Sequence, residues 1–168
     1  MKTCSILAFD PGTTKSPVGW AWCYATQEEN GYKIQNSRIG TFWATKNRKL
    51  GGQADALVLE KSVTRLLKHY SPDTMAICRP MGRYQVVLYQ QGKQVGILSL
   101  LAQKQNIEIV EKPDNEFRKT LWGAAVTKQE NTLKHLEETD WELTSHEADA
   151  LTAAYATAKN ILTIETKE

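Results

Sequence analysis

The sequence has few cysteines, no long hydrophobic run and almost no excess of charge. Its three cysteines, Cys4, Cys23 and Cys78, are an odd number without close spacing, so a disulfide framework is not expected. The apolar run near the N-terminus ends at Asp10, which is too early for a signal peptide or a membrane span. We therefore expect reduced thiols, no membrane partner, and a cytoplasmic location or an intracellular organellar or viral setting.

The composition is typical of an ordinary folded domain. Hydrophobic residues make up 41% of the chain and charged residues 24%, which argues against disorder and fibrous repeats. A chain of 168 residues fits a single hydrophobic core. A net charge of +2 neither predicts nor excludes nucleic-acid binding, because a basic face can exist on a balanced protein. We predict one domain over residues 1–168 with one active site.

Hydrophobic periodicity and turn residues predict three strands followed by αβ units. The first three strands are expected at 3–9, 18–24 and 32–43, with a turn at Glu29-Asn30-Gly31 between the last two. The later elements are expected, in order, as a helix at 54–70, a strand at 74–78, a helix at 86–105, a strand at 107–110, and helices at 116–122, 127–138 and 145–161. This order favours an α/β fold with a mixed five-stranded central sheet flanked by helices.

Two short motifs, one near each end of the chain, contain residues suited to metal chemistry. Asp10 ends the first strand and a proline-glycine turn follows, so its carboxylate should lie at the sheet edge beside free backbone amides. His146 and Asp149 are three residues apart at the start of the last helix, so they share one face and can bind one metal ion. Each motif also has a purely structural interpretation, as a plain turn and as a helix start with Ser145 as N-cap and Glu147 as a first-turn acid.

The order and separation of these motifs resemble the RuvC-type Holliday junction resolvases. Residues 6–14 (ILAFDPGTT) and Gly19 are similar to the first strand and hairpin of that family, and His146-x-x-Asp149-Ala150-Leu151 is similar to its last-helix motif. The resemblance implies an RNase H-like fold and a homodimeric endonuclease that nicks four-way junction DNA symmetrically. It also implies Mg²⁺ as cofactor, with Mn²⁺ as a substitute, and assigns Asp10, His146 and Asp149 as catalytic metal ligands.

Cys78 is the main departure from the family pattern, which has a catalytic Glu at the end of the fourth strand. Mg²⁺ is a hard ion that prefers oxygen ligands, so a neutral thiol is a poor replacement. Loss of a ligand that helps to hold two metal ions should leave DNA binding intact and impair cleavage. Glu and Cys codons differ at every base, which argues against simple drift, so we interpret the chain as an engineered, catalytically impaired variant of an active parent. A deliberate change is one explanation, and a natural buried strand thiol is the other.

Basic residues late in the chain are the predicted phosphate contacts. The family has basic residues before and after a glycine, which here is Gly123, and the matching residues are Arg118 with its neighbour Lys119, and Lys128. Phosphate binding depends on Lys and Arg. Taken one by one, these residues are equally typical of a solvated surface.

The loop after Cys78 is the second predicted DNA contact. In the family this region projects a large apolar or aromatic side chain into the junction, and here Met81 or Tyr84 could stack on bases or wedge between them. Arg79 and Arg83 lie in the same loop. Ordinary packing is the alternative for Met81 and Tyr84, and the five tryptophans of the chain are interpreted as packing residues.

Two other functions are compatible with the same motifs. One is a non-catalytic junction-binding module in which Cys78 is natural. The other is a different RNase H-like nuclease that acts on RNA or on branched replication DNA. For a junction resolvase, the largely apolar helix at 86–105 is the expected dimer contact, because a two-fold dimer matches the symmetry of a four-way junction.

Overall fold

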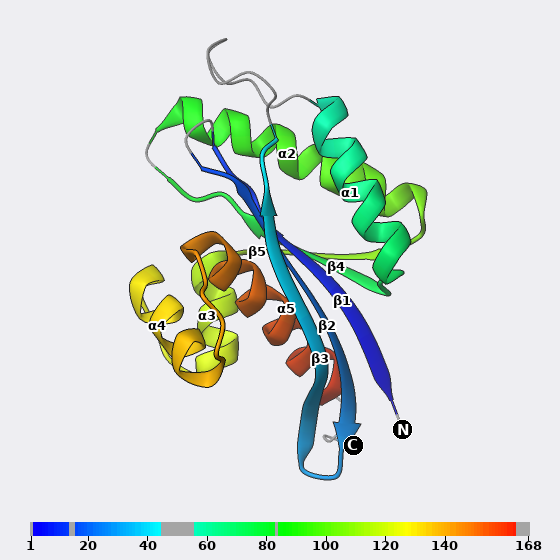
Figure 1. Cartoon of the computed structure of the whole chain (residues 1–168), viewed down its shortest axis with the longest axis vertical. Coiled ribbons are helices and arrows are strands. Elements are labelled where there is room, and N and C mark those ends of the chain that lie inside the picture. The colour runs from blue at the N-terminus through cyan, green and yellow to red at the C-terminus, as the bar shows by residue number, and fades with distance from the viewer. Residues whose placement is uncertain (1, 14–15, 45–55, 83, 164–168) are drawn as a thin grey trace.

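The computed structural model contains the expected mixed five-stranded sheet (Figure 1). The structure describes residues 2–13, 16–44, 56–82 and 84–163. The strands are β1 (Thr3–Asp10), β2 (Val18–Glu28), β3 (Gly31–Phe42), β4 (Thr74–Arg79) and β5 (Glu108–Pro113). Their order in the sheet is β3-β2-β1-β4-β5. The β1–β2 and β2–β3 pairs are antiparallel, whereas β1–β4 and β4–β5 are parallel, which confirms the predicted mixture.

Helices cover both faces of the sheet. One face carries α1 (Ala56–Tyr70) and α2 (Gln85–Lys104), and the other carries α5 (Ser145–Thr163), against which α3 (Asp114–Trp122) and α4 (Lys128–Glu138) pack (Figure 1). Each face has its own buried hydrophobic cluster. Among the described residues, no helix is both long enough and apolar enough to span a bilayer.

The alternation of side chains along the central strands decides which face receives the polar residues. In β1, Ala8 packs in the cluster beneath α5, whereas Leu7 and Phe9 pack in the cluster beneath α1 and α2. Because successive side chains of a strand point to opposite faces, Asp10 at the end of β1 belongs to the α5 side. In β4, Cys78 is also in the cluster beneath α5. Asp10, the last residue of β1, and Cys78, the next-to-last residue of β4, therefore both face the layer formed by α3, α4 and α5.

Two helix starts differ from the sequence-based expectation. The third helix begins at Asp114 and not at 116, because Pro113 has an extended backbone (ψ 148°) and β5 passes into α3 without a loop. The cap of the last helix is Thr144 and not Ser145. Thr144 Oγ1 accepts a hydrogen bond from the Glu147 amide (3.3 Å), and Glu147 Oε2 accepts one from the Thr144 amide (2.9 Å). This reciprocal capping gives Glu147 a structural role at the helix start.

Candidate metal centre

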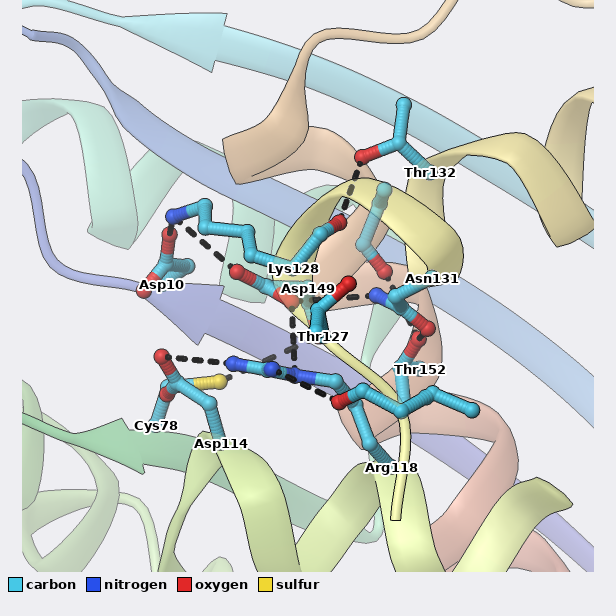
Figure 2. Close-up of polar contacts among 12 residues, drawn as sticks. Asp10, Cys78, Asp114, Arg118, Thr127, Lys128, Asn131, Thr132, Asp149 and Thr152 are labelled. Atoms are coloured by element: carbon cyan, nitrogen blue, oxygen red, sulfur yellow. Dashed lines mark hydrogen bonds and ion pairs between the residues drawn. The ribbon is translucent and has the colours of Figure 1, made fainter. Parts of the chain in front are cut away.

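Acidic and basic side chains from four elements meet on the α5 side of the sheet (Figure 2). Asp10 comes from the end of β1, Asp114 from the first residue of α3, and Asp149 from the second turn of α5. Arg118 of α3 and Lys128 of α4 supply the positive charges. Asp10 and Asp149 are buried. The fold therefore brings together residues that are as far apart in the sequence as Asp10 and Asp149.

Two cations hold the three carboxylates of this site. The ammonium nitrogen of Lys128 lies 3.0 Å from Asp149 Oδ2 and 3.7 Å from Asp10 Oδ2. Arg118 Nε lies 3.4 Å from Asp149 Oδ1, and a terminal guanidinium nitrogen lies 3.7 Å from Asp114 Oδ2. Arg118 also donates a hydrogen bond to the carbonyl oxygen of Val126 (3.1 Å). With three carboxylates facing two cations, the centre keeps an excess of negative charge.

The pKa values of these groups reflect their crowding and burial. Burial raises the pKa of Asp114, and the charges of Asp10 and Asp149 raise it further, to about 6. Burial also raises the pKa of Asp149, against the opposing effect of Lys128. For Lys128, burial alone would lower the pKa, but the neighbouring carboxylates outweigh it and the pKa is raised. A bound cation would relieve this concentration of negative charge.

His146 lies directly beside Asp10. Its Nδ1 is hydrogen-bonded to Asp10 Oδ2, and this contact depends on a close approach between the start of α5 and β2. Gly19, the partner of Asp10 in the β1–β2 register, lies against the His146 backbone. A Cβ at position 19 would lie 2.3 Å from the His146 carbonyl oxygen, so no larger residue fits there without moving α5. Gly19 thus allows Asp10 and His146 to meet.

The turn after Asp10 is held from the opposite layer by two glutamines of α2. Gln94 is buried, and its side-chain amide accepts from the Gly12 nitrogen (3.1 Å) and donates to the Gly12 oxygen (3.2 Å). Gln91 Nε2 donates to the carbonyl oxygen of Pro11 (2.9 Å). A buried amide that mimics a backbone partner in this way fixes the turn and therefore the position of Asp10.

Asp149 is positioned by a buried hydrogen-bond network that includes residues not singled out in the sequence. Asn131 Nδ2 donates to Asp149 Oδ1 (3.0 Å). The amide oxygen of Asn131 accepts from Trp122 Nε1 (2.8 Å) and from Thr152 Oγ1 (2.7 Å), and Thr152 Oγ1 is also hydrogen-bonded to His135 Nε2 (2.7 Å). Trp122 therefore has a polar contact in addition to the packing role expected for it. Burial lowers the pKa of His135 to about 4, so the ring is neutral at pH 7.

Cys78 is buried at the edge of the same centre. Its thiol lies 3.8 Å from the main-chain oxygen of Asp149. Burial raises the pKa of Cys78 well above its usual value, and the carboxylates of Asp114, Asp10 and Asp149 add to this effect. The side chain is therefore a neutral thiol. One ligand atom from each of Asp10, Cys78 and Asp114 falls within 4.8 Å of the others, which places the carboxylate of Asp114 next to the thiol.

The predicted phosphate contacts lie at different places relative to this centre. Lys128 is inside it, with 40% of its side chain exposed. Arg118 is also inside it, but only 12% of its side chain is exposed and its contacts are with Asp114, Asp149 and Val126. Lys119 is exposed on α3. Arg118 therefore holds the carboxylates of Asp114 and Asp149 in place. Lys128 is the more exposed of the two basic residues in the centre.

The predicted DNA-contacting loop after β4 is on the surface. Met81 and Tyr84 are 70% and 78% exposed, respectively, and Tyr84 is the N-cap residue of α2. Arg79 is exposed at the end of β4. Arg83 lies outside the described residues. The exposure of Met81 and Tyr84 disfavours the alternative that they are ordinary packing residues.

Several solved structures share this fold. Thermus thermophilus RuvC in complex with a Holliday junction substrate is similar with a TM-score of 0.73 and 17% identity, over 94% of this chain and 94% of that chain. A second structure of Thermus thermophilus RuvC is similar with a TM-score of 0.68 and 18% identity, over 94% of this chain and 95% of that chain. The yeast mitochondrial Holliday junction resolvase Ydc2 is similar with a TM-score of 0.58 and 16% identity, over 92% of this chain and 77% of that chain. No protein-family model and no curated protein sequence matches the chain. The chain therefore has the RNase H-like fold of RuvC, as the resemblance implied.

Proposed function

We propose that the chain is a metal-dependent endonuclease that binds four-way DNA junctions and nicks them. The observation that carries this proposal is that Asp10 contacts His146 directly and is joined to Asp149 through Lys128, on an RNase H-like fold. Support for the substrate comes from Thermus thermophilus RuvC, whose structure in complex with a Holliday junction substrate has the same fold.

The donor groups of the centre fit Mg²⁺ or Mn²⁺. Carboxylate oxygens predominate, and oxygen is the ligand atom that these ions prefer. The Lys128 ammonium contacts both Asp149 Oδ2 and Asp10 Oδ2, which marks a place that favours a cation. We propose Asp10, His146 and Asp149 as metal ligands. Bound ions would stabilise the attacking and leaving oxygens in phosphodiester hydrolysis.

The protein side chains orient the ligands and meet the DNA phosphate. Arg118 and Asn131 hold the carboxylate of Asp149 from two directions, which fixes a ligand before any ion binds. Lys128 can move from the carboxylates to a phosphate oxygen, because its side chain is the more exposed of the two cations. In the proposed reaction, the oxygen of water bonds to phosphorus as one backbone P–O bond breaks, which nicks the strand.

Symmetric nicking requires two such centres, and we propose a homodimer. The helix α2 has three large apolar side chains at its surface, Val86, Tyr89 and Leu100, and a two-fold dimer would match the symmetry of a four-way junction. Met81 or Tyr84 would contact bases near the crossover. Arg79, Arg83 and Lys119 are proposed as additional DNA contacts.

The prediction that Cys78 impairs cleavage stays a prediction. It assumes that no other carboxylate reaches the metal ions that a Glu at this place would bind. DNA binding does not depend on this assumption, because phosphate and base contacts are made by other residues.

Binding to a panel of nucleic acids tests the substrate. We would compare gel shifts of a four-way junction, a linear duplex of the same sequence and an RNA–DNA hybrid, with Ca²⁺ present to permit binding without cutting. The proposal expects the junction to bind at least about tenfold more tightly than the duplex. A preference for the hybrid would favour another RNase H-like nuclease, and equal binding of all three would contradict the proposal.

Cleavage of the same panel in Mg²⁺ separates an enzyme from a binding module. The control is Asp10→Asn, which removes a proposed ligand but keeps the shape of the side chain. Junction nicking by the wild type that Asp10→Asn abolishes supports the enzyme. Junction binding without nicking, in the wild type and also in Cys78→Glu, would favour a non-catalytic junction-binding module.

A further inference from the structure

Asp114 lies beside Cys78, where the family pattern has its catalytic Glu. The strands β4 and β5 are parallel neighbours, with Cys78 paired to Lys112 and Arg79 paired to Pro113. Asp114 follows directly as the first residue of α3. The carboxyl ends of parallel neighbours meet at the same edge of a sheet. A carboxylate at the end of β5 can therefore reach the region that a carboxylate at the end of β4 would reach.

The position of the Asp114 side chain agrees with this arrangement (Figure 2). Ligand atoms of Asp114, Asp10 and Cys78 lie within 4.8 Å of one another. The side chain of Cys78 is shorter than that of Glu, so position 78 leaves room for a carboxylate from the residue that directly follows the neighbouring strand. Asp114 is 29% exposed, so it lies between the buried carboxylates and solvent.

A role in the helix alone does not account for Asp114. An acidic residue in the first turn favours the helix dipole, but the exposed Glu116 supplies this charge in the same turn. The ion pair with Arg118 is 3.7 Å long, which is longer than a hydrogen bond. A third carboxylate close to Asp10 also adds like-charge repulsion that a purely structural residue has no reason to cause.

Asp149 gives an independent indication that the centre is built for cations. Its side chain is 1% exposed, although it carries a carboxylate. The ammonium of Lys128 is placed at 3.0 Å from this oxygen and also contacts Asp10. A positively charged group therefore already bridges the two carboxylates.

We propose that Asp114 is a metal ligand that replaces the Glu missing at position 78. The centre then has three carboxylates, from Asp10, Asp114 and Asp149, and it binds the divalent ions that the proposed nuclease needs. The inference rests on the proposed function. It also replaces the expectation of an impaired enzyme, because the oxygen ligand is supplied by the first residue of α3, directly after β5, and not from β4.

Mn²⁺ binding to the DNA-free protein tests the inference without any measurement of activity. Isothermal titration of the wild type, Asp114→Asn and the matched control Glu116→Gln would give the affinity and the number of bound ions. Loss of a direct ligand should weaken Mn²⁺ binding at least about tenfold, or remove one bound ion. Glu116→Gln should bind as the wild type does. Unchanged binding in Asp114→Asn, or no Mn²⁺ binding by the wild type, would overturn the inference.

A second variant tests the replacement itself. Adding Cys78→Glu to Asp114→Asn moves the carboxylate from the start of α3 back to β4, and it should restore Mn²⁺ binding. Folding is checked by urea denaturation. If the double variant does not fold, the Mn²⁺ titration of Asp114→Asn alone decides the inference. If Mn²⁺ binding depends on Asp114 but no junction is nicked, the proposed function fails and the inference stands. If Asp114→Asn nicks junctions as fast as the wild type, the inference fails and the proposed function stands.

Discussion

Replacement of Asn131 by Ala should destabilise the protein and disturb the metal centre together. Asn131 is fully buried, and its side chain makes hydrogen bonds to Asp149 (3.0 Å), Trp122 (2.8 Å) and Thr152 (2.7 Å). The variant leaves the indole N–H and a carboxylate oxygen without these partners. Each buried polar group left unsatisfied costs about 1–3 kcal/mol, so we expect a loss of about 3–4 kcal/mol of unfolding free energy.

Urea denaturation and Mn²⁺ titration measure the two effects separately. The matched control is Asn115→Ala, which removes an exposed amide and should change stability by less than about 0.5 kcal/mol. Asn131→Asp keeps the volume and the acceptor oxygen but removes the donor to Asp149, so it should disturb Mn²⁺ binding even where stability is retained. A loss below about 1 kcal/mol in Asn131→Ala, with unchanged Mn²⁺ binding, would refute the role given to this network.

Three further predictions follow from the geometry. Gly19→Ala should cost about 1–3 kcal/mol and weaken Mn²⁺ binding, because the new methyl group would lie 2.3 Å from the His146 oxygen; wild-type stability in urea would contradict this. The pKa of His135 is lowered from its usual 6.5 to about 4, so its contribution of about 3 kcal/mol is present above pH 6.5 and is lost as the pH falls toward 4. Urea denaturation at a series of pH values in this range should show that the unfolding free energy of the wild type falls with pH by about 3 kcal/mol more than that of His135→Gln. An equal pH dependence in the two proteins would contradict this prediction. Cys78 is a buried, neutral thiol, so a thiol reagent should label it only as fast as the protein unfolds; rapid labelling of Cys78 in the native protein, located by mass spectrometry, would show that the site is open.

The sequence was sufficient for the architecture and for part of the centre. The apolar run of the first strand and the proline-glycine turn after it placed Asp10 at a strand end, and the three-residue spacing of His146 and Asp149 placed both on one face of a helix. These are local signals, because the period of a strand or a helix fixes where neighbouring side chains point. The meeting of the two motifs could be expected only from the resemblance, since a separation of more than a hundred residues has no local signature.

Asp114 was missed for a physical reason. Its proximity to Cys78 arises from the parallel register of β4 and β5, and that register is a tertiary property. In the sequence, an aspartate after a proline indicates only the start of a helix. The supporting roles of Asn131 and Gln94 could not be predicted from the sequence either. Single polar residues in helices are usually exposed, and only the fold shows that these two are buried.

The most direct test of the account is strand nicking of a four-way junction in Mg²⁺ by the wild type and by Asp10→Asn, with a linear duplex as the competing substrate. Denaturing gels would locate the cut positions on each of the four strands. The account predicts cuts in two strands related by the junction's symmetry, and a loss of at least about tenfold in Asp10→Asn with junction binding retained. Equal nicking by both proteins, or duplex cut as fast as junction, would contradict it.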